Sequence, residues 1–418
     1  MEVSEQIQNR RAIEAMRAGV PNQDVVRIMG CSQDKLERTF IKQLEEVRTN
    51  FVSGLQSPGM LIAGDFGAGK SHLLEHMQHL ALERNFVCSK FVISKETPLY
   101  DVSKLYQAAI KSAVAPGKIG FALTEIASSL KFNDQGYAEF SKWLNQPGIE
   151  ICSWFAATSY LYEYLKGDEE IRDRIIRFWS GDKLNLSELK SWLRKAGQRA
   201  TYKLDKVTSK ELARQRFHFA SRLMIAAGYS GWVLLIDEVE LIGRYARMQR
   251  ARSYAQIAGL LGKVSGTRIP GLTSVMAITD DFEAAVLDDK MDEEKIPGKL
   301  KAHDDADDLI LCSRAETGMR LIRKKLVLQK PNSDMINSTF VKLRTAYEKA
   351  YGWLPPAEIV EPDLKAPMRQ HVKRGITIWD LRRLYPDYVP YMVTVPIKIG
   401  YHEQSGLREN KENAASNT

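Results

Sequence analysis

A glycine-rich stretch at residues 64–71, with the sequence GDFGAGKS, has the residue types and spacing that bind phosphate groups. It fits the pattern G-x-x-x-x-G-K-[ST], in which glycines let backbone N–H groups approach a phosphate closely. The Lys70 ammonium can reach the β- and γ-phosphates of ATP, and the Ser71 hydroxyl can bind Mg²⁺. A chance glycine turn is the alternative. The residues predicted to contact ATP are Gly64, Asp65, Phe66, Gly67, Ala68, Gly69, Lys70, Ser71 and His72.

Two acids follow an apolar run at residues 232–236. Such a run predicts a buried parallel strand whose carboxyl end carries Asp237 and Glu238. In a phosphate-binding hydrolase, Asp237 would help to hold Mg²⁺ and Glu238 would polarise the attacking water. Two acids can also end a strand by chance, but a phosphate loop and an acidic pair are expected together. We therefore predict that ATP is hydrolysed.

A further candidate catalytic group ends the apolar run at residues 272–278, which predicts another buried strand with a polar tip. The hydroxyl of Thr279 could hydrogen-bond the attacking water or the γ-phosphate. Asp280 is the second choice for this role, and an ordinary strand end is the alternative.

Five apolar runs, alternating with helical patterns, must position these groups. They lie at residues 60–63, 86–94, 232–238, 272–280 and 326–329, and the first leads through the glycine-rich stretch into a helix at 71–83. The pattern predicts an α/β fold with a parallel sheet of about five strands and helices on both faces. Residues 51–330 would form this core.

The tract at residues 99–229 is too long for one crossover helix and predicts a helical insertion. Its aromatic residues are expected in the core, and its basic run from Lys190 to Lys210 on a solvated face. Residues 287–308 are strongly charged, which predicts a surface excursion.

Residues 1–50 form a predicted N-terminal helical extension. Breaks at 19–22 and 30–32 give residues 11–40 the outline of a helix-turn-helix, with Ser32 as the N-cap of the second helix. Such a unit can bind DNA. It can also simply cover the nucleotide, and we favour that interpretation.

The C-terminal part is expected to form a helical lid over residues 331–400, with helices at 333–352 and 376–385. The Asn-, Glu- and Ser-rich residues 401–418 predict a disordered tail.

The composition is that of an ordinary globular protein, with 44% hydrophobic and 27% charged residues. A net charge of +8 permits a polyanionic partner such as double-stranded DNA without establishing one. No run reaches the roughly 18–20 apolar residues that cross a bilayer, and the N-terminus has no apolar signal core. Four scattered cysteines without metal-binding spacing predict buried thiols in the cytoplasm: Cys31, Cys88, Cys152 and Cys312.

The plan of the chain resembles the AAA+ ATPases, and more specifically the bacterial P-loop family that contains the BREX phage-defence ATP-binding subunit BrxD. The resemblance extends over about residues 8–395 and rests on residues 10–21 (RRAIEAMRAGVP), 64–72 (GDFGAGKSH), 91–99 (FVISKETPL), 235–238 (LIDE) and 377–385 (TIWDLRRLY). It implies an ATPase that acts in a multi-protein, DNA-directed complex, together with other defence subunits and further copies of itself.

The resemblance also implies two arginine roles. An arginine that completes a neighbouring subunit's site would be Arg320 or Arg323, just before the fifth strand. A lid arginine that senses the γ-phosphate is less clear, because Ile378 and Trp379 stand where initiator-like relatives often carry Pro-Arg. Arg382 and Arg383, one turn away, are substitutes that could also face solvent.

Three functions remain open from the sequence. The first is a nucleotide-driven switch or motor, in which ATP turnover changes assembly with partners or DNA. The second is a DNA-binding regulator whose helix-turn-helix recognises an operator while nucleotide tunes its affinity. The third is a kinase that shares the phosphate loop, which the acidic pair and the lid make less favoured.

Overall fold

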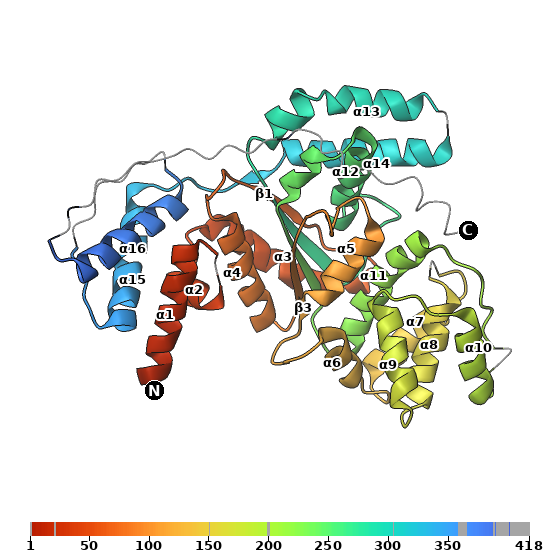
Figure 1. Ribbon diagram of the computed structural model, residues 1–418. Helices are drawn as coiled ribbons and strands as arrows, with labels where there is room; N and C mark the ends of the chain where they lie inside the picture. Colours follow the sequence, from red (N-terminus) through yellow and green to blue (C-terminus); the bar gives the residue numbers. More distant parts are fainter. Residues whose placement is uncertain are drawn as a thin grey trace.

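A computed structural model of the chain describes residues 2–20, 22–149, 151–198, 201–303, 305–357, 366–387, 389 and 401. Its centre is one six-stranded sheet with the strand order β3-β2-β4-β5-β1-β6, surrounded by helices (Figure 1). The predicted α/β class is confirmed. Among the described residues, no helix is long and apolar enough to cross a membrane.

The five predicted strands all form, and they pair in parallel. A sixth strand, β3 (Ala113–Val114), pairs antiparallel with β2 and was not predicted, because two residues carry no readable pattern. The parallel order brings the carboxyl ends of β1, β4 and β5 together at one edge of the sheet. The parallel strands are β1 (Met60–Ala63), β2 (Val87–Val92), β4 (Trp232–Asp237), β5 (Leu272–Ile278) and β6 (Leu326–Val327).

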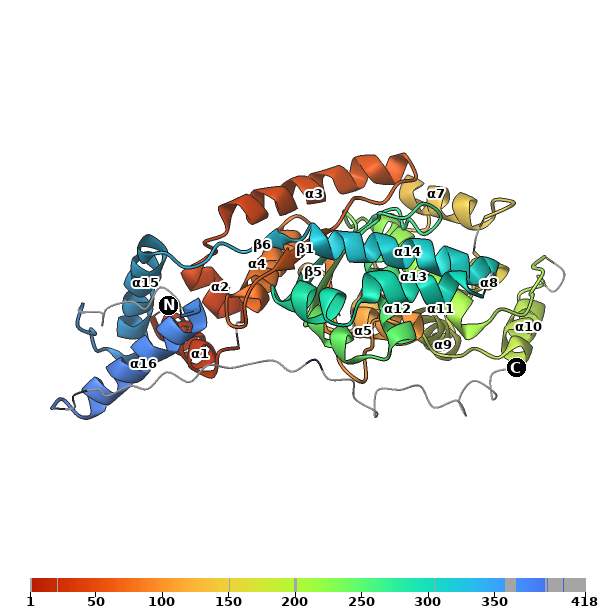
Figure 2. The ribbon, with the colours of Figure 1, turned by 90° about the horizontal axis from the view of Figure 1, so that it is seen from above.

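Helices cover both faces of the sheet, as predicted. Along β1, Ile62 belongs to a core with α3 (Asp34–Val52) and α4 (Lys70–Glu83). Leu61, on the opposite face, belongs to the larger core that includes α5, α11 and α12. Figure 2 shows α3 on one side of the strands and α5 and α12 on the other. Because both faces are buried, apolar residues on both faces dominate the central strands β4 and β5.

The long tract after β2 is helical and forms a lobe at one side of the sheet (Figure 1). Trp179, Phe155 and Phe219 pack together at its centre and are fully buried, so these aromatic residues serve as core. The helices are α5 (Val102–Lys111), α6 (Ala122–Ser128), α7 (Gln135–Leu144), α8 (Ser153–Tyr164), α9 (Glu169–Ser180), α10 (Leu186–Lys195) and α11 (Ser209–Ala226).

Most of the described residues in the charged segment 287–308 are exposed, as expected, but the segment also contains a packed helix that was not predicted. This helix, α13 (Asp292–Lys301), packs on α14 (Ala306–Arg323) and α12 (Arg247–Leu260). Asp292 is fully buried and accepts hydrogen bonds from Arg250 Nε at 2.6 Å and Arg250 Nη2 at 2.7 Å. Two short turns precede these helices, a 3₁₀-helix (Val239–Arg244) and a π-helix (Glu283–Asp288).

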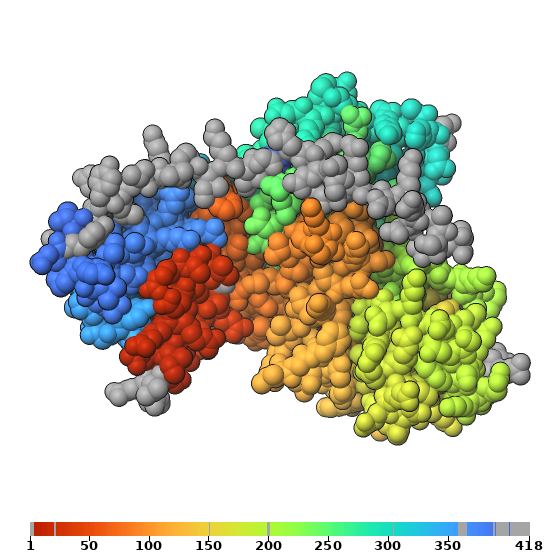
Figure 3. Space-filling model, viewed as in Figure 1, coloured from red at the N-terminus to blue at the C-terminus, as the bar shows by residue number. Residues whose placement is uncertain are grey.

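At the other end of the molecule, the first two helices pack against the last two (Figures 1 and 3). Ala12, Ile13 and Met16 share a buried cluster with Phe340 and Trp379. Arg17 Nη2 lies 2.8 Å from Asp380 Oδ2 and adds a polar contact between α1 and α16. These helices are α1 (Glu2–Ala18), α2 (Gln23–Met29), α15 (Ser333–Tyr351) and α16 (Met368–Leu384).

Two details of the terminal regions differ from expectation. Helix α3 begins at Asp34 with Gln33 as its N-cap, so Ser32 is not the cap. Tyr401, the expected start of a disordered tail, is buried and hydrogen-bonded. The rest of that tail, and residues 358–365 and 390–400 of the expected lid, lie outside the described residues.

Candidate functional site

The glycine-rich stretch joins the end of β1 to the start of α4 at the carboxyl edge of the sheet. Gly67 and Gly69 have φ angles of 80° and 104°, which side-chain-bearing residues rarely adopt. The loop curls around Lys70, whose Nζ donates to the carbonyl oxygens of Gly64 at 2.8 Å and Asp65 at 3.4 Å. The ammonium is thus held beside the loop, where a bound phosphate would compete for it.

The other predicted loop residues surround this lysine. Asp65 Oδ2 lies 3.5 Å from Lys330 Nζ, and His72 Nε2 lies 2.7 Å from the carbonyl oxygen of Gly30. Phe66, Gly67, Ala68, Gly69, Ser71 and His72 all line one cavity together with Lys70. Gly64 and Asp65 line a neighbouring cavity instead.

The two predicted acids lie at the end of β4, near this loop. Asp237 is buried, and its Oδ1 accepts a hydrogen bond from the backbone N–H of Glu238 at 2.9 Å. Glu238 has a φ of 57°, an uncommon value for a non-glycine residue, and such strain is often found at functional sites. Its side chain lines the same cavity as Lys70. The strained backbone therefore directs this carboxylate toward the glycine-rich loop.

Thr279 lies buried at the end of β5, next to the strands that carry the loop and the acids. Its Oγ1 is 2.6 Å from the hydroxyl of Tyr401, which in turn donates to Asp281 Oδ1 at 3.0 Å. Because Tyr401 donates to Asp281, Thr279 is the donor to Tyr401. Asp280, the second choice, lies 3.9 Å from Lys325 Nζ and lines the neighbouring cavity. The Thr279 hydroxyl is thus engaged by a residue far along the chain.

Glu240, close enough to Lys70, Asp237 and Glu238 to interact with their charges, was not singled out in the sequence. Its side chain is 1% exposed, and neither carboxylate oxygen has a hydrogen-bond partner among the described residues. Burial raises its pKa to about 7; the charges of Glu238 and Asp237 add to the rise and Lys70 opposes it. A third acid in the pattern D-E-x-E was the signal available in the sequence.

The shared cavity has a volume of about 260 Å³ and a largely apolar wall opposite the loop. That wall comes from both ends of the chain, where the N-terminal cover and the lid were expected, but its individual residues were not predicted. An apolar slot beside a phosphate-binding loop suits the flat face of a purine base. Its apolar residues are Ala15, Met16, Val25, Met29, Leu328, Met335, Met368 and Val372.

Arg369, at the first turn of α16, contacts the glycine-rich loop. Its backbone N–H donates to the carbonyl oxygen of Gly67 at 3.3 Å, and its guanidinium carbon lies 5.5 Å from the centre of the Phe66 ring. The suggested substitutes, Arg382 and Arg383, lie in the last turn of this helix, roughly 20 Å along its axis. Arg383 Nε instead donates to the Tyr347 hydroxyl at 3.1 Å.

The two candidate finger arginines have different surroundings on α14. Arg323 donates to Glu283 at 2.7 Å, Asp288 at 2.5 Å and Glu293 at 2.8 Å, and hydrogen bonds to these carboxylates raise its pKa. Arg320 is exposed and donates from Nη2 to Thr317 Oγ1 at 3.0 Å. Arg320 is therefore the better placed of the two to contact a neighbouring molecule.

In a comparison with protein families, the chain matches the model described as "BREX system ATP-binding protein BrxC/D". It spans residues 5–130 and 155–286, which include the glycine-rich loop, both acids and Thr279. Comparison with curated proteins and with solved structures found no match. Because the family match covers more than half of the 418 residues, the chain belongs to the family of BREX system ATP-binding proteins BrxC/D.

Proposed function

We propose that this protein is an AAA+ P-loop ATPase that binds ATP with Mg²⁺ and hydrolyses it as a cytoplasmic subunit of a BREX phage-defence complex. The observation that carries the proposal is the cavity that Lys70 and Glu238 share, with the buried Asp237 next to it. Phosphoryl transfer requires a cation that binds the phosphates, an acid that orients the attacking water and an acid that binds the metal ion. Lys70, Glu238 and Asp237 are candidates for these three roles.

Each residue has a role in the proposed reaction. Backbone N–H groups of residues 64–71 and Lys70 would hold the phosphates, and the apolar wall would hold the base. Ser71 and Asp237 offer hydroxyl and carboxylate oxygens, which Mg²⁺ prefers, and the ion would neutralise phosphate charge. Glu238 would accept a hydrogen bond from the attacking water and orient it. The Thr279 hydroxyl would break its hydrogen bond to Tyr401 and donate a hydrogen bond to the γ-phosphate instead.

The arrangement of the cavity favours a nucleotide-driven switch or motor. Its walls come from the sheet, from α1 and α2, and from α15 and α16, so a bound nucleotide would touch all three. A ligand that contacts several elements favours the arrangement of those elements that binds it most tightly, so its binding can shift their relative positions. Such movement would change assembly with other subunits, with further copies of the chain, or with double-stranded DNA.

The packing of α2 supports the covering role of the N-terminal helices over the operator-binding regulator. Val25 and Val26 of this seven-residue helix are buried, and α2 packs against α1, α4 and α15. The helix that follows the second break, α3, packs Leu36, Phe40 and Leu44 into the core that it shares with β1 and α4. Both helices of the helix-turn-helix outline thus contribute to the packing around the nucleotide-binding core.

The test is ATP turnover by the purified protein, with and without double-stranded DNA, alongside Lys70→Ala and Glu238→Gln. Lys70→Ala should lose ATP binding, whereas Glu238→Gln should keep binding and lose nearly all turnover. Lys330→Ala removes another lysine beside the loop and is the matched control, with near-normal turnover expected. Parental turnover in Glu238→Gln would remove that residue from the mechanism. DNA-stimulated turnover would support the DNA-directed role, and indifference to DNA would limit the proposal to a protein-activated switch.

A further inference from the structure

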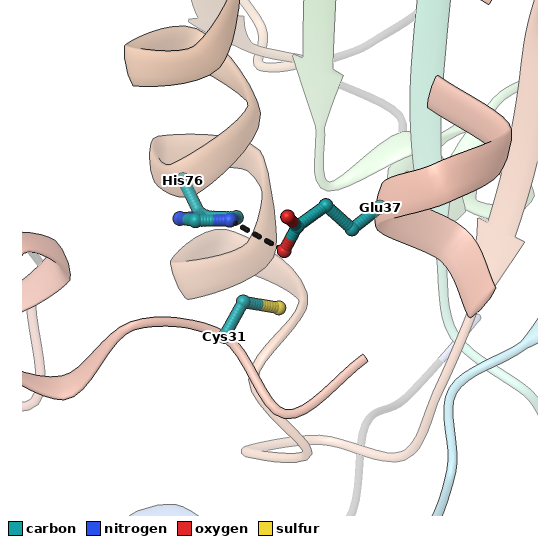
Figure 4. Close-up of side chains that lie close together, drawn as sticks. All are labelled: Cys31, Glu37 and His76. Atoms are coloured by element: carbon teal, nitrogen blue, oxygen red, sulfur yellow. Dashed lines mark hydrogen bonds and ion pairs between the residues drawn. The ribbon is translucent and has the colours of Figure 1, made fainter. Parts of the chain in front are cut away.

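A second cluster of metal-binding side chains lies beside the cavity, outside the residues assigned to ATP. Cys31 follows α2, Glu37 lies in the first turn of α3, and His76 lies in the middle of α4. One ligand atom from each side chain lies within 4.8 Å of the others. Figure 4 shows the Cys31 sulfur, a Glu37 oxygen and a His76 ring nitrogen directed toward one point.

The local structure fixes all three side chains near that point. His76 Nε2 lies 2.8 Å from Glu37 Oε2, and the two side chains are 12% and 30% exposed. One turn earlier on α4, His72 Nε2 lies 2.7 Å from the carbonyl oxygen of Gly30 and holds the chain just before Cys31. The turn that carries the thiol is therefore attached to the helix that carries the imidazole.

We propose that Cys31, Glu37 and His76 bind one Zn²⁺ ion, separate from the Mg²⁺ of the nucleotide site. Thiolate, imidazole and carboxylate are the usual zinc ligands, and a sulfur ligand selects against Mg²⁺ and Ca²⁺. Around tetrahedral zinc, ligand atoms lie about 3–4 Å apart, so small side-chain rotations bring these three into place. Water takes the fourth position.

The chemistry of Cys31 favours a metal ligand over a reactive thiol. Burial raises the pKa of this thiol to about 11, so at neutral pH it is a poor nucleophile. A metal ion displaces the thiol proton directly, so such a cysteine can still be a ligand. A plain His76–Glu37 hydrogen bond beside an unused thiol is the competing interpretation, and metal binding separates the two.

The position of the ion would give it a structural effect on the ATP site. Zinc would join the turn after α2 and the start of α3 to α4, the helix that begins at Lys70. Cys31 also lines the cavity that holds Lys70 and Glu238. The ion would thus hold the N-terminal cover against the nucleotide-binding loop.

The experiment uses the full-length protein, stripped with a chelator and then titrated with Zn²⁺ in the absence of nucleotide. One equivalent should bind, and Cys31→Ser or His76→Gln should weaken it by more than about 100-fold, since changes even outside the ligand set cost 10–100-fold. Matched controls are Cys152→Ser, another partly buried thiol, and His79→Gln, the next histidine on α4. Both controls should bind zinc as the parent does.

Two measurements on the unmutated ligands keep the test decisive if a variant misfolds. Co²⁺ in place of Zn²⁺ should give a thiolate-to-metal charge-transfer band, and zinc should protect Cys31, but not Cys152, from alkylation. Zinc binding that Cys31→Ser leaves unchanged, or a cobalt spectrum without the thiolate band, would overturn the proposal. Lys70→Ala should retain zinc, so failure at the ATP site and failure here are distinguishable.

Discussion

The Glu240 carboxyl is buried and has no hydrogen-bond partner within the described part of the chain, and the charges of Asp237 and Glu238 act on it. The pKa of this carboxyl is higher in the folded protein than in the unfolded chain. Its contribution to stability is therefore fully present only at pH values below the unfolded-state pKa, near 4.5. That stability is lost as the pH rises through about 7, because the folded protein must then bury a charge. The nucleotide-free protein therefore bears a cost at this position at neutral and alkaline pH.

Replacing this carboxyl with a neutral amide should remove that cost. Glu240→Gln should raise the free energy of unfolding at pH 8 by on the order of 2–3 kcal/mol and leave it nearly unchanged near pH 4. Denaturant unfolding of the nucleotide-free protein at both pH values measures the difference. Glu46→Gln, which changes an exposed carboxylate of α3, should have no such pH-dependent effect. A gain of equal size at both pH values would refute the electrostatic explanation.

The position of Arg369 beside the glycine-rich loop leads to a prediction about the affinity for ATP. Arg369→Ala should weaken ATP binding by roughly tenfold, the effect of losing about 1.4 kcal/mol of interaction. Arg383→Ala, at the far end of the same helix, should change affinity less than twofold. Isothermal titration with ATP and Mg²⁺ on both variants tests this, with thermal unfolding to check the fold. An affinity of Arg369→Ala within twofold of the parent would show that this arginine does not contact the nucleotide.

Some site residues were predictable because their chemistry is local in the sequence. The loop residues, Asp237 and Glu238 follow apolar runs directly, and the structure brings Lys70 and Glu238 to one cavity. Arg369 was missed because its helix was expected to begin only at residue 376. The segment before that position contains mostly polar residues, such as Arg369 and Lys373, so its apolar periodicity is weak.

At the scale of elements, the contact between α12 and α14 depends on a glycine. A Cβ added at Gly318 would lie 2.0 Å from the backbone oxygen of Tyr254, far inside any allowed contact. The two helices approach backbone to backbone only because this position has no side chain. Any substitution there must push the helices apart.

Gly318→Ala should therefore destabilise the protein by roughly 1–3 kcal/mol, as overpacking of a close-packed interior does. Gly298→Ala, in α13, is the matched control, since a Cβ there meets no atom within 4 Å. Alanine favours a helix over glycine, so this control should be neutral or stabilising by up to about 1 kcal/mol. Denaturant unfolding of both variants measures the contrast, and equal stabilities would refute the close-contact argument.

The strands were easier to predict than the arrangement of α13. Five successive apolar residues define β4, and the mostly apolar stretch at residues 272–278 defines β5. Residues 287–308 look solvated because they contain many acids, yet Asp292 is buried against Arg250, 42 positions earlier. A charge pattern cannot reveal a partner so distant along the chain, so the sequence favours a surface position for such residues.

At the scale of the whole molecule, the exposed Arg320 leads to a prediction about assembly. If Arg320 completes a neighbour's site, Arg320→Ala should lower turnover by roughly a hundredfold or more. Mixing it with Lys70→Ala should restore activity, because the Lys70 variant supplies an intact arginine to the other subunit's intact loop. Turnover of mixtures against the two variants alone is the measurement. Activity no higher than their sum would contradict a shared site.

The cavity itself could not have been predicted from the sequence. Residues in the ranges 15–33 and 328–372 both line it, although some 300 positions separate them in the chain. No local pattern marks Met16, Met335 or Met368 as ligand-facing, because apolar residues on helices are usually core. The helix-turn-helix outline at residues 11–40 had two interpretations, DNA binding and covering of the nucleotide. Only the packing of α1 and α2 separates them.

The pairing of α1 with α15 also has a consequence for synthesis of the protein. Helix α1 leaves the ribosome well before α15, which begins at Ser333, so Ala12, Ile13 and Met16 stay unpaired while some 300 residues are made. At roughly 5–20 residues per second, that wait is on the order of tens of seconds. During it, the nascent chain carries an unburied apolar helix face, which is the kind of surface that chaperones bind. The cavity beside the glycine-rich loop is complete only after α15 and α16 have emerged.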